Sequence, residues 1–243
     1  ARDAALVDAS GEPGEVTLIQ ARDAALQRID AATRASARHA VIVLRDEARA
    51  TTTDPAAHHD ELVAAVRDGQ LQQVQSLIQQ GAEVNVRGLD GSSPLLLATA
   101  DNQVEIARAL IEAGADVNQK NLIQDSPYLL AGASGYNQIL SLTLSHGADL
   151  KSTNRYGGTA LIPACERGHV ETVRLLIAAG VDLNHVNRLG WTCLLEAIVL
   201  ADGGPAHQQI VAQLIAAGAD LNLPDNAGVS PLRHAEQRGQ RAI

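Results

Sequence analysis

Aromatic residues are scarce in this chain of 243 residues. Three Tyr and one Trp make up 2% of the sequence, and Phe and Met are absent. Any core must therefore be built from Ala, Val, Leu and Ile, which suits thin, closely packed helices better than a broad globule. Because 46% of the residues are apolar, the chain can still bury a core and is not disordered as a whole.

Other scarcities exclude whole classes of function. The chain has 19 basic residues against 28 acidic ones, and its net charge of -9 repels nucleic-acid backbones and anionic membranes. The longest apolar runs, such as residues 40–44, are far too short to span a bilayer. The two cysteines, Cys165 and Cys193, match no C-x-x-C metal or redox spacing. The sequence therefore predicts neither a zinc site nor a disulfide framework.

What the chain does have is an internal repeat. A Gly-Ala-acid tripeptide, or a close variant, recurs at intervals of 33, 33, 33 and 38 residues, beginning at Gly81, Gly114, Gly147, Gly180 and Gly218. Twelve residues after each glycine comes a tetrapeptide that starts with a hydroxyl residue, at Ser93, Ser126, Thr159, Thr192 and Ser230. Two patterns that stay in register over five units indicate a repeat architecture.

Each part of the repeat has a local physical role. Ser and Thr are preferred helix N-caps, and the Pro that follows the cap in three units has the dihedral angle that a helix start requires. A second helix is predicted by apolar residues at spacings of three and four, such as Val170, Val173 and Ile177. The recurring glycines then lie just past that helix, where a left-handed backbone conformation ends it.

The repeat resembles the ankyrin repeat from about Asp60 to the C-terminus. The helix-start tetrapeptide, the glycine after the second helix and the 33-residue period all agree with that family. Residues 156–169, 190–200 and 202–204 are also similar to small stand-alone bacterial ankyrin-repeat proteins. The resemblance implies an all-α ankyrin-repeat solenoid of about six helix-turn-helix units with short hairpin turns, preceded by an N-terminal helical extension.

On this basis the chain divides into an extension, residues 1–54, and an ankyrin-repeat domain, residues 55–243. The predicted units are 55–87, 88–120, 121–153, 154–186, 187–224 and 225–243. The Gly-Pro break at 201–205 predicts a loop between the two helices of the fifth unit. The last unit ends where its second helix is due, which predicts a truncated C-terminal cap.

The extension does not follow the repeat. Its periodicity predicts an amphipathic helix over 15–39, and the apolar run at 40–44 fits either a buried strand or a continuing helix. Residues 51–55 are typical of a linker. We expect the extension to pack on the first repeat, and the alternative is a separate helix for partner binding or oligomerisation.

The few aromatic residues mark a candidate binding surface. Tyr156 and Trp191 occupy turn positions that, by the resemblance, line the concave, partner-facing surface of ankyrin proteins. Trp, Tyr and Arg are enriched in interface hot spots because they bury a large area at low entropic cost. The predicted partner-binding residues are Arg155, Tyr156, Glu166, Arg167, Arg188, Leu189 and Trp191.

A second candidate site lies on the first helices. At one repeat position the units carry Leu97, Leu130, Pro163, Glu196 and His234, so an apolar series becomes polar. A charge on an inner face is costly unless it is paired, and Arg155, Arg188 and His234 are the expected partners of Glu196. A buried polar link between repeats explains this series. The alternative is a small-molecule or enzymatic site in the inner groove around Glu196, His234 and Cys165.

Cys165 and His169, four residues later, resemble the thiol and base of a nucleophilic catalytic site. In the repeat register, however, Cys165 replaces a small packing residue of the first helix, and Cys193 replaces the Pro that follows a cap. Neither position offers the oriented base and oxyanion site that a nucleophile needs. We therefore expect structural roles for both cysteines and no catalytic residue.

The sequence as a whole predicts a non-enzymatic module that binds another protein. We expect no cofactor and no metal, because the histidines are not spaced to gather three ligands. Nucleic acids and membranes are not expected partners, and self-association through the extension or the open C-terminal end is an alternative. We expect a cytoplasmic protein, with a periplasmic protein after signal cleavage as the alternative.

Overall fold

The computed structural model describes residues 55–201 and 203–241, and the structural statements below refer to these residues. They contain eleven α helices and no strand, which confirms the all-α prediction for this part of the chain. The helix predicted over 15–39 and the apolar run at 40–44 lie outside the described residues. The helices are α2 (Pro55–Arg67), α3 (Leu71–Gln79), α4 (Pro94–Ala100), α5 (Val104–Glu112), α6 (Pro127–Ser134), α7 (Asn137–Ser145), α8 (Leu161–Glu166), α9 (Val170–Ala179), α10 (Cys193–Val199), α11 (Pro205–Ala216) and α12 (Pro231–Gln237).

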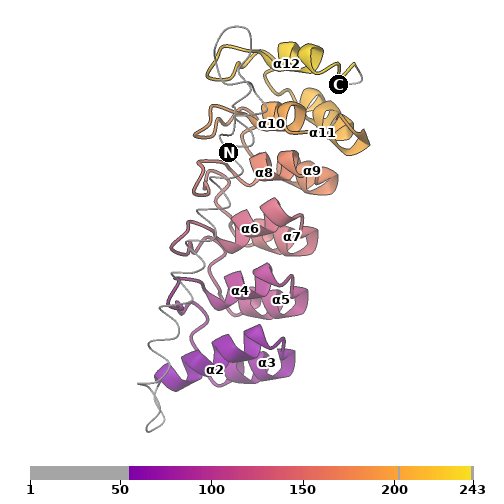
Figure 1. Cartoon of the computed structure of the whole chain (residues 1–243). Coiled ribbons are helices and arrows are strands. Elements are labelled where there is room, and N and C mark those ends of the chain that lie inside the picture. The colour runs from indigo at the N-terminus through magenta and orange to yellow at the C-terminus, as the bar shows by residue number, and fades with distance from the viewer. Residues whose placement is uncertain (1–54, 202, 242–243) are drawn as a thin grey trace, which may run out of the picture. The chain divides into compact units, whose positions relative to one another are not determined.

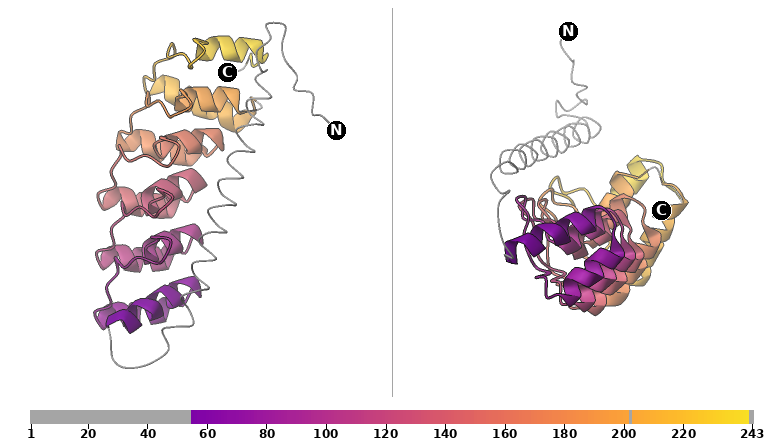
Figure 2. Two further views of the ribbon diagram at one scale, coloured as in Figure 1. Left: turned by 60° about the vertical axis from the view of Figure 1, so that its left-hand side comes forward. Right: turned by 90° about the horizontal axis from the view of Figure 1, so that it is seen from below.

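Helices α2 to α11 form pairs that stack in chain order, and α12 follows as a single helix (Figure 1). Within a unit the two helices pack on each other, as α4 does on α5 and α6 on α7. Between units, first helices pack on first helices and second helices on second helices, so that α8 contacts both α6 and α10. The turns that connect successive units project from one edge of the stack (Figure 2). Among the described helices, none combines the length and apolar character needed to cross a bilayer.

Four of the five predicted N-caps are confirmed. The side-chain oxygens of Ser93, Ser126, Thr192 and Ser230 each accept a hydrogen bond from the backbone N–H three residues later. Thr159 was expected to do the same, and for this unit the prediction is wrong. Its hydroxyl is buried without a hydrogen-bond partner, and its backbone carbonyl accepts the bond from Ile162 N–H instead. Helix α8 consequently begins only at Leu161 and spans six residues.

Asparagine side chains join successive units at the turn edge. Asn85 accepts a hydrogen bond from Asp116 N–H at 2.7 Å and donates to the Gly114 carbonyl at 3.1 Å. Asn118 makes the same pair of bonds to the third unit, at Asp149 N–H and the Gly147 carbonyl. At the equivalent position of the third unit stands Lys151, so this link is interrupted between the third and fourth units.

Tyr128 is the one aromatic side chain among the large residues that are fully buried. It occupies the helix position that carries Leu95, Leu161 and Leu194 in neighbouring units, and its hydroxyl has no hydrogen-bond partner. Burial, with a smaller contribution from the Asp149 charge, raises the pKa of the Tyr128 phenol well above its usual value. The phenol therefore stays protonated, and its unpaired hydroxyl carries a desolvation cost of about 1–3 kcal/mol.

We expect Tyr128→Phe to increase the free energy of unfolding by about 1 kcal/mol, because the substitution removes a buried hydroxyl that has no partner. Urea unfolding followed by circular dichroism measures the change. Tyr136→Phe, at a half-buried tyrosine, is the control and should change stability by less than about 0.5 kcal/mol. A clear loss of stability in the Tyr128 variant would contradict the description of this hydroxyl as unpaired.

The glycines after the second helices have the predicted left-handed conformation, as in Gly180 with φ of 86°. A second row of positive φ occurs in the turns between units, at Gly91, Gly157, Gly190 and Gly228. In the third unit this position is Gln124, with φ of 65°. A residue with a Cβ is strained in this conformation, so the third turn carries a local cost that the other turns avoid.

Gln124→Gly should stabilise the protein by about 0.5–1 kcal/mol, since relief of the left-handed strain exceeds the added chain entropy of glycine. The matched control is the reverse change, Gly180→Ala, where an added Cβ would meet no atom within 4 Å. It should destabilise by about 1 kcal/mol through backbone strain alone. Thermal unfolding of both variants measures the effect, and changes of the same sign in both would refute this explanation.

Candidate partner-binding surface

The third, fourth and fifth turns between units are each built around an asparagine side chain at their base. In the fourth turn, Asn154 Oδ1 accepts hydrogen bonds from Tyr156 N–H at 2.9 Å and from Gly158 N–H at 3.0 Å. In the fifth turn, Asn187 Oδ1 accepts from Leu189 N–H at 2.9 Å and Trp191 N–H at 3.0 Å. Asparagine competes well for nearby backbone donors, so the Asn-Arg-x-Gly sequence folds a tight turn locally. We call residues 154–157 and 187–190 the fourth and fifth fingers.

The two fingers are joined to each other by hydrogen bonds. Arg188 N–H donates to the Tyr156 carbonyl at 3.0 Å, and Arg188 Nη1 donates to the Arg155 carbonyl at 2.9 Å. The imidazole Nε2 of His185 lies 2.6 Å from the Gly157 carbonyl. These bonds connect residues 28 to 33 positions apart in the chain, so the spacing of the fingers is set before any partner binds.

Five of the seven predicted partner-binding residues lie on or beside these fingers. Arg155 stacks over the Tyr156 ring, with 4.8 Å from the guanidinium carbon to the ring centroid, and its Nη1 lies 3.3 Å from Asp125 Oδ2. Leu189 is 42% exposed, whereas Tyr156 and Trp191 are half-buried. We call this set the finger surface, and it consists of Arg155, Tyr156, Arg188, Leu189 and Trp191.

The other two predicted residues lie at the far end of α8 from the fingers. Glu166 is the last residue of α8, and Arg167 caps the helix. Arg167 Nη1 donates to the Ala133 carbonyl of the preceding unit at 2.6 Å, so this cation is used to join two units. Burial lowers the pKa of the neighbouring His169, and the Arg167 charge adds to that effect.

Sequence reasoning missed two exposed apolar residues in the earlier turns. Leu122 is 74% exposed and Leu89 is 52% exposed. Both stand two residues before the positive-φ residue of their turn, the position that Arg155 and Arg188 occupy in the fourth and fifth fingers. Alignment of the turns, rather than of the helices, would have revealed them.

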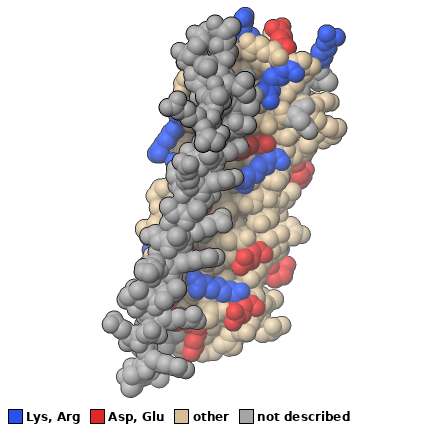
Figure 3. All heavy atoms as spheres, in the orientation of Figure 1, with Lys and Arg blue, Asp and Glu red and all other residues tan. Residues whose placement is uncertain are grey.

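On the face shown in Figure 3, charges of both signs are mixed. In the view of Figure 3, Lys and Arg side chains alternate with Asp and Glu over a largely uncharged surface outside the grey atoms. On this face the charges create no extended field of one sign.

The buried polar residues of the first helices pair with the bases of the turns. Asn187 Nδ2 donates to Glu196 Oε1 at 2.9 Å, and His234 Nε2 lies 2.8 Å from Asp225 Oδ2, both across nine residues. Asn187 was not among the expected partners of Glu196. Burial by itself raises the pKa of the Asp225 carboxyl, but hydrogen bonds from Val229 N–H and His234 outweigh it and hold that pKa below its usual value.

The spacing of the cysteines predicted no disulfide, and this prediction is wrong. Cys165 and Cys193 are joined in a disulfide, with 5.5 Å between their Cα atoms, and both side chains are fully buried. Their separation of 28 residues carries no motif, which is why the spacing gave no signal. In this bonded state Cys165 has no thiol to act as a nucleophile beside His169. Within the described ranges, no group of three or more His, Cys, Asp or Glu side chains is arranged to hold a metal ion.

Comparison with known proteins gives consistent matches. The sequence profile of ankyrin repeats, in three copies, matches residues 34–121, 62–149 and 128–225. The crystal structure of an ankyrin repeat domain from Acinetobacter baumannii is 59% identical, with a TM-score of 0.73, and the match covers 74% of this chain and 92% of that chain. An ankyrin repeat protein from Enterococcus is 40% identical, with a TM-score of 0.75, over 79% of this chain and 96% of that chain. No functionally curated protein matches the sequence.

The Asp225 carboxylate should make the last unit sensitive to acid. Its pKa is lower in the folded chain, so its stabilising contribution is complete above the unfolded pKa of about 4 and is lost as the pH falls through the folded value. We expect wild-type protein to lose more stability than Asp225→Asn when urea unfolding is compared at about pH 6 and about pH 3. His234→Gln removes one of the two main hydrogen bonds and should show intermediate sensitivity. Parallel losses in all three proteins would contradict the assignment.

Proposed function

The chain belongs to the ankyrin-repeat family, whose members generally bind other proteins, and we propose that it binds a partner protein through the concave face of its central repeats. The contact is centred on the finger surface. In this proposal the protein holds the contacting side chains in fixed positions and catalyses no reaction. The identity of the family supports the general role, and the geometry of the fourth and fifth fingers supports this location.

The single observation that carries the location is the hydrogen-bonded coupling of the two fingers. The bonds from Arg188 to the Tyr156 and Arg155 carbonyls hold aromatic, arginine and leucine side chains at a fixed spacing. A preorganised surface loses little conformational entropy on binding, so more of the contact energy is available as affinity. Tyr, Trp and Arg are also the residue types that dominate interface hot spots.

The inner-groove alternative around Glu196, His234 and Cys165 receives no support from its geometry. Glu196 and His234 are 3% and 4% exposed, and their hydrogen bonds to Asn187 and Asp225 join the first helices to the turns. Cys165 is bonded to Cys193. These contacts suit a structural role for the three residues better than a site that a ligand enters.

Leu189→Ala should weaken binding to a purified partner at least about tenfold, because Leu189 is the exposed apolar side chain of the finger surface. Trp191→Ala and Arg155→Ala should also weaken it, although Arg155 additionally contacts Asp125 and Tyr156 and is the less clean probe. Affinity capture from the source organism provides the partner, and titration calorimetry measures the Kd.

The matched control is Ile215→Ala, at a leucine-sized side chain of similar exposure, 47%, on α11 rather than on a finger. It should leave the Kd within about twofold of wild type. Equal effects of the Leu189 and Ile215 variants, or normal binding by the Leu189 variant, would refute this surface. Light scattering on the intact chain distinguishes a partner protein from self-association.

A further inference from the structure

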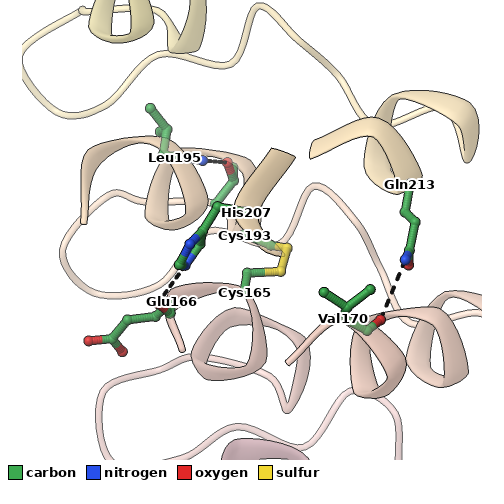
Figure 4. The surroundings of a disulfide bond; sticks show 8 residues. Cys165, Glu166, Val170, Cys193, Leu195, His207 and Gln213 are labelled. Carbon is green, nitrogen blue, oxygen red and sulfur yellow. Dashed lines mark hydrogen bonds between the residues drawn. A yellow bond between two sulfur atoms is a disulfide. The ribbon is translucent and has the colours of Figure 1, made fainter. Parts of the chain in front are cut away.

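The disulfide crosses the boundary between the fourth and fifth units. Cys165 lies in the last turn of α8, and Cys193 is the first residue of α10 (Figure 4). These are the first helices of neighbouring units, and they pack directly against each other. The chain has no other cysteine. Both cysteines of the chain are therefore used in one contact between two repeats.

Noncovalent links cross the same boundary and bring the two helix pairs close together. The His207 Nε2 atom lies 3.1 Å from the Glu166 carbonyl, and Gln213 Nε2 donates to the Val170 carbonyl at 3.5 Å (Figure 4). The Cα separation of 5.5 Å falls in the ordinary range for a disulfide. The packing of the units thus places the two sulfurs within bonding distance without a special loop.

The bond is protected from exchange by its burial. Neither Cys165 nor Cys193 exposes any side-chain surface, and α10 around Cys193 is buried along its length. Thiol–disulfide exchange requires a thiolate to reach one of the sulfurs, so a reductant can attack only after the fourth and fifth units separate. A buried disulfide of this kind is structural and is typical of oxidising compartments, because the cytosol keeps thiols reduced.

We propose that the Cys165–Cys193 disulfide is a covalent clamp between the fourth and fifth repeats, and that the protein works in an oxidising compartment such as the bacterial periplasm. Formation of the bond removes two electrons and two protons from the two thiols. A disulfide of a thiol–disulfide oxidant accepts both and becomes a dithiol. The clamp limits separation of the units that carry the two fingers, and the proposal itself does not depend on a partner.

The compartment is tested by trapping thiols in cells of the source organism. Acid quenching followed by alkylation under denaturing conditions should leave both cysteines unmodified, and they should become modifiable only after reduction. The isolated protein should correspondingly weigh less than its reduced form by two hydrogen atoms. Direct alkylation of Cys165 and Cys193 in quenched cells would overturn the proposal.

The clamp is tested on the purified protein without a partner. Dithiothreitol should lower the Tm of the wild-type chain by about 5–10 °C, because the unfolded state gains conformational freedom. The Cys165→Ala/Cys193→Ala variant is the control: its Tm should not respond to the reductant. Equal Tm values for oxidised and reduced wild-type protein would overturn the clamp.

Hydrogen exchange locates the effect along the stack. Reduction should accelerate amide exchange in α8 to α12 at least about tenfold while leaving α4 and α5 unchanged, because repeat proteins couple mainly to their nearest neighbours. Uniform acceleration over all helices, or none, would contradict a clamp at this boundary. Failure of these tests would leave the proposed finger surface intact, since Leu189 and the finger hydrogen bonds do not involve the sulfurs.

Discussion

Helices of 6 to 13 residues are too short to be stable alone in water, and in the described part of this chain every helix falls in that range. Each unit gains stability only by burying its apolar stripe against the next unit. Helix α8, at six residues, depends most on its neighbours and is packed between α6 and α10. The stacking of first helices on first helices is therefore the contact on which the remainder of the structure depends.

Stacking also explains where the polar groups lie. Asparagines at the turn edge bridge one unit to the next, as Asn85 and Asn118 do, while the turn-base residues Asn187 and Asp225 satisfy Glu196 and His234 inside the stack. A buried polar side chain without a partner would weaken the contact between units, so each partner has a direct energetic role. At the tips of the turns, by contrast, Leu122, Leu189 and Arg188 remain exposed.

The disulfide and the proposed finger surface both belong to the fourth and fifth units. Trp191 stands two residues before Cys193, and the fingers precede α8 and α10, so a covalent contact between these helices also restricts the relative motion of the fingers. The proposed binding through side chains held at a fixed spacing depends on such rigidity, because flexible side chains and loops must lose entropy when a partner binds. Removal of the cysteines changes the rigidity of the scaffold, whereas truncation of Leu189 removes a proposed contact and leaves the disulfide in place.

The sequence by itself determined the all-α repeat, the four N-caps at Ser93, Ser126, Thr192 and Ser230, and the left-handed glycines such as Gly180. These features depend on residues within one turn of helix, so a local pattern suffices to predict them. Only the tertiary structure decided that Cys165 bonds Cys193, that Asn187 bonds Glu196, and that Arg167 holds the Ala133 carbonyl. Such contacts depend on how one unit is rotated and translated relative to the next. The period of the repeat predicts that a neighbouring unit exists, but it does not predict the distances between the side chains of the two units.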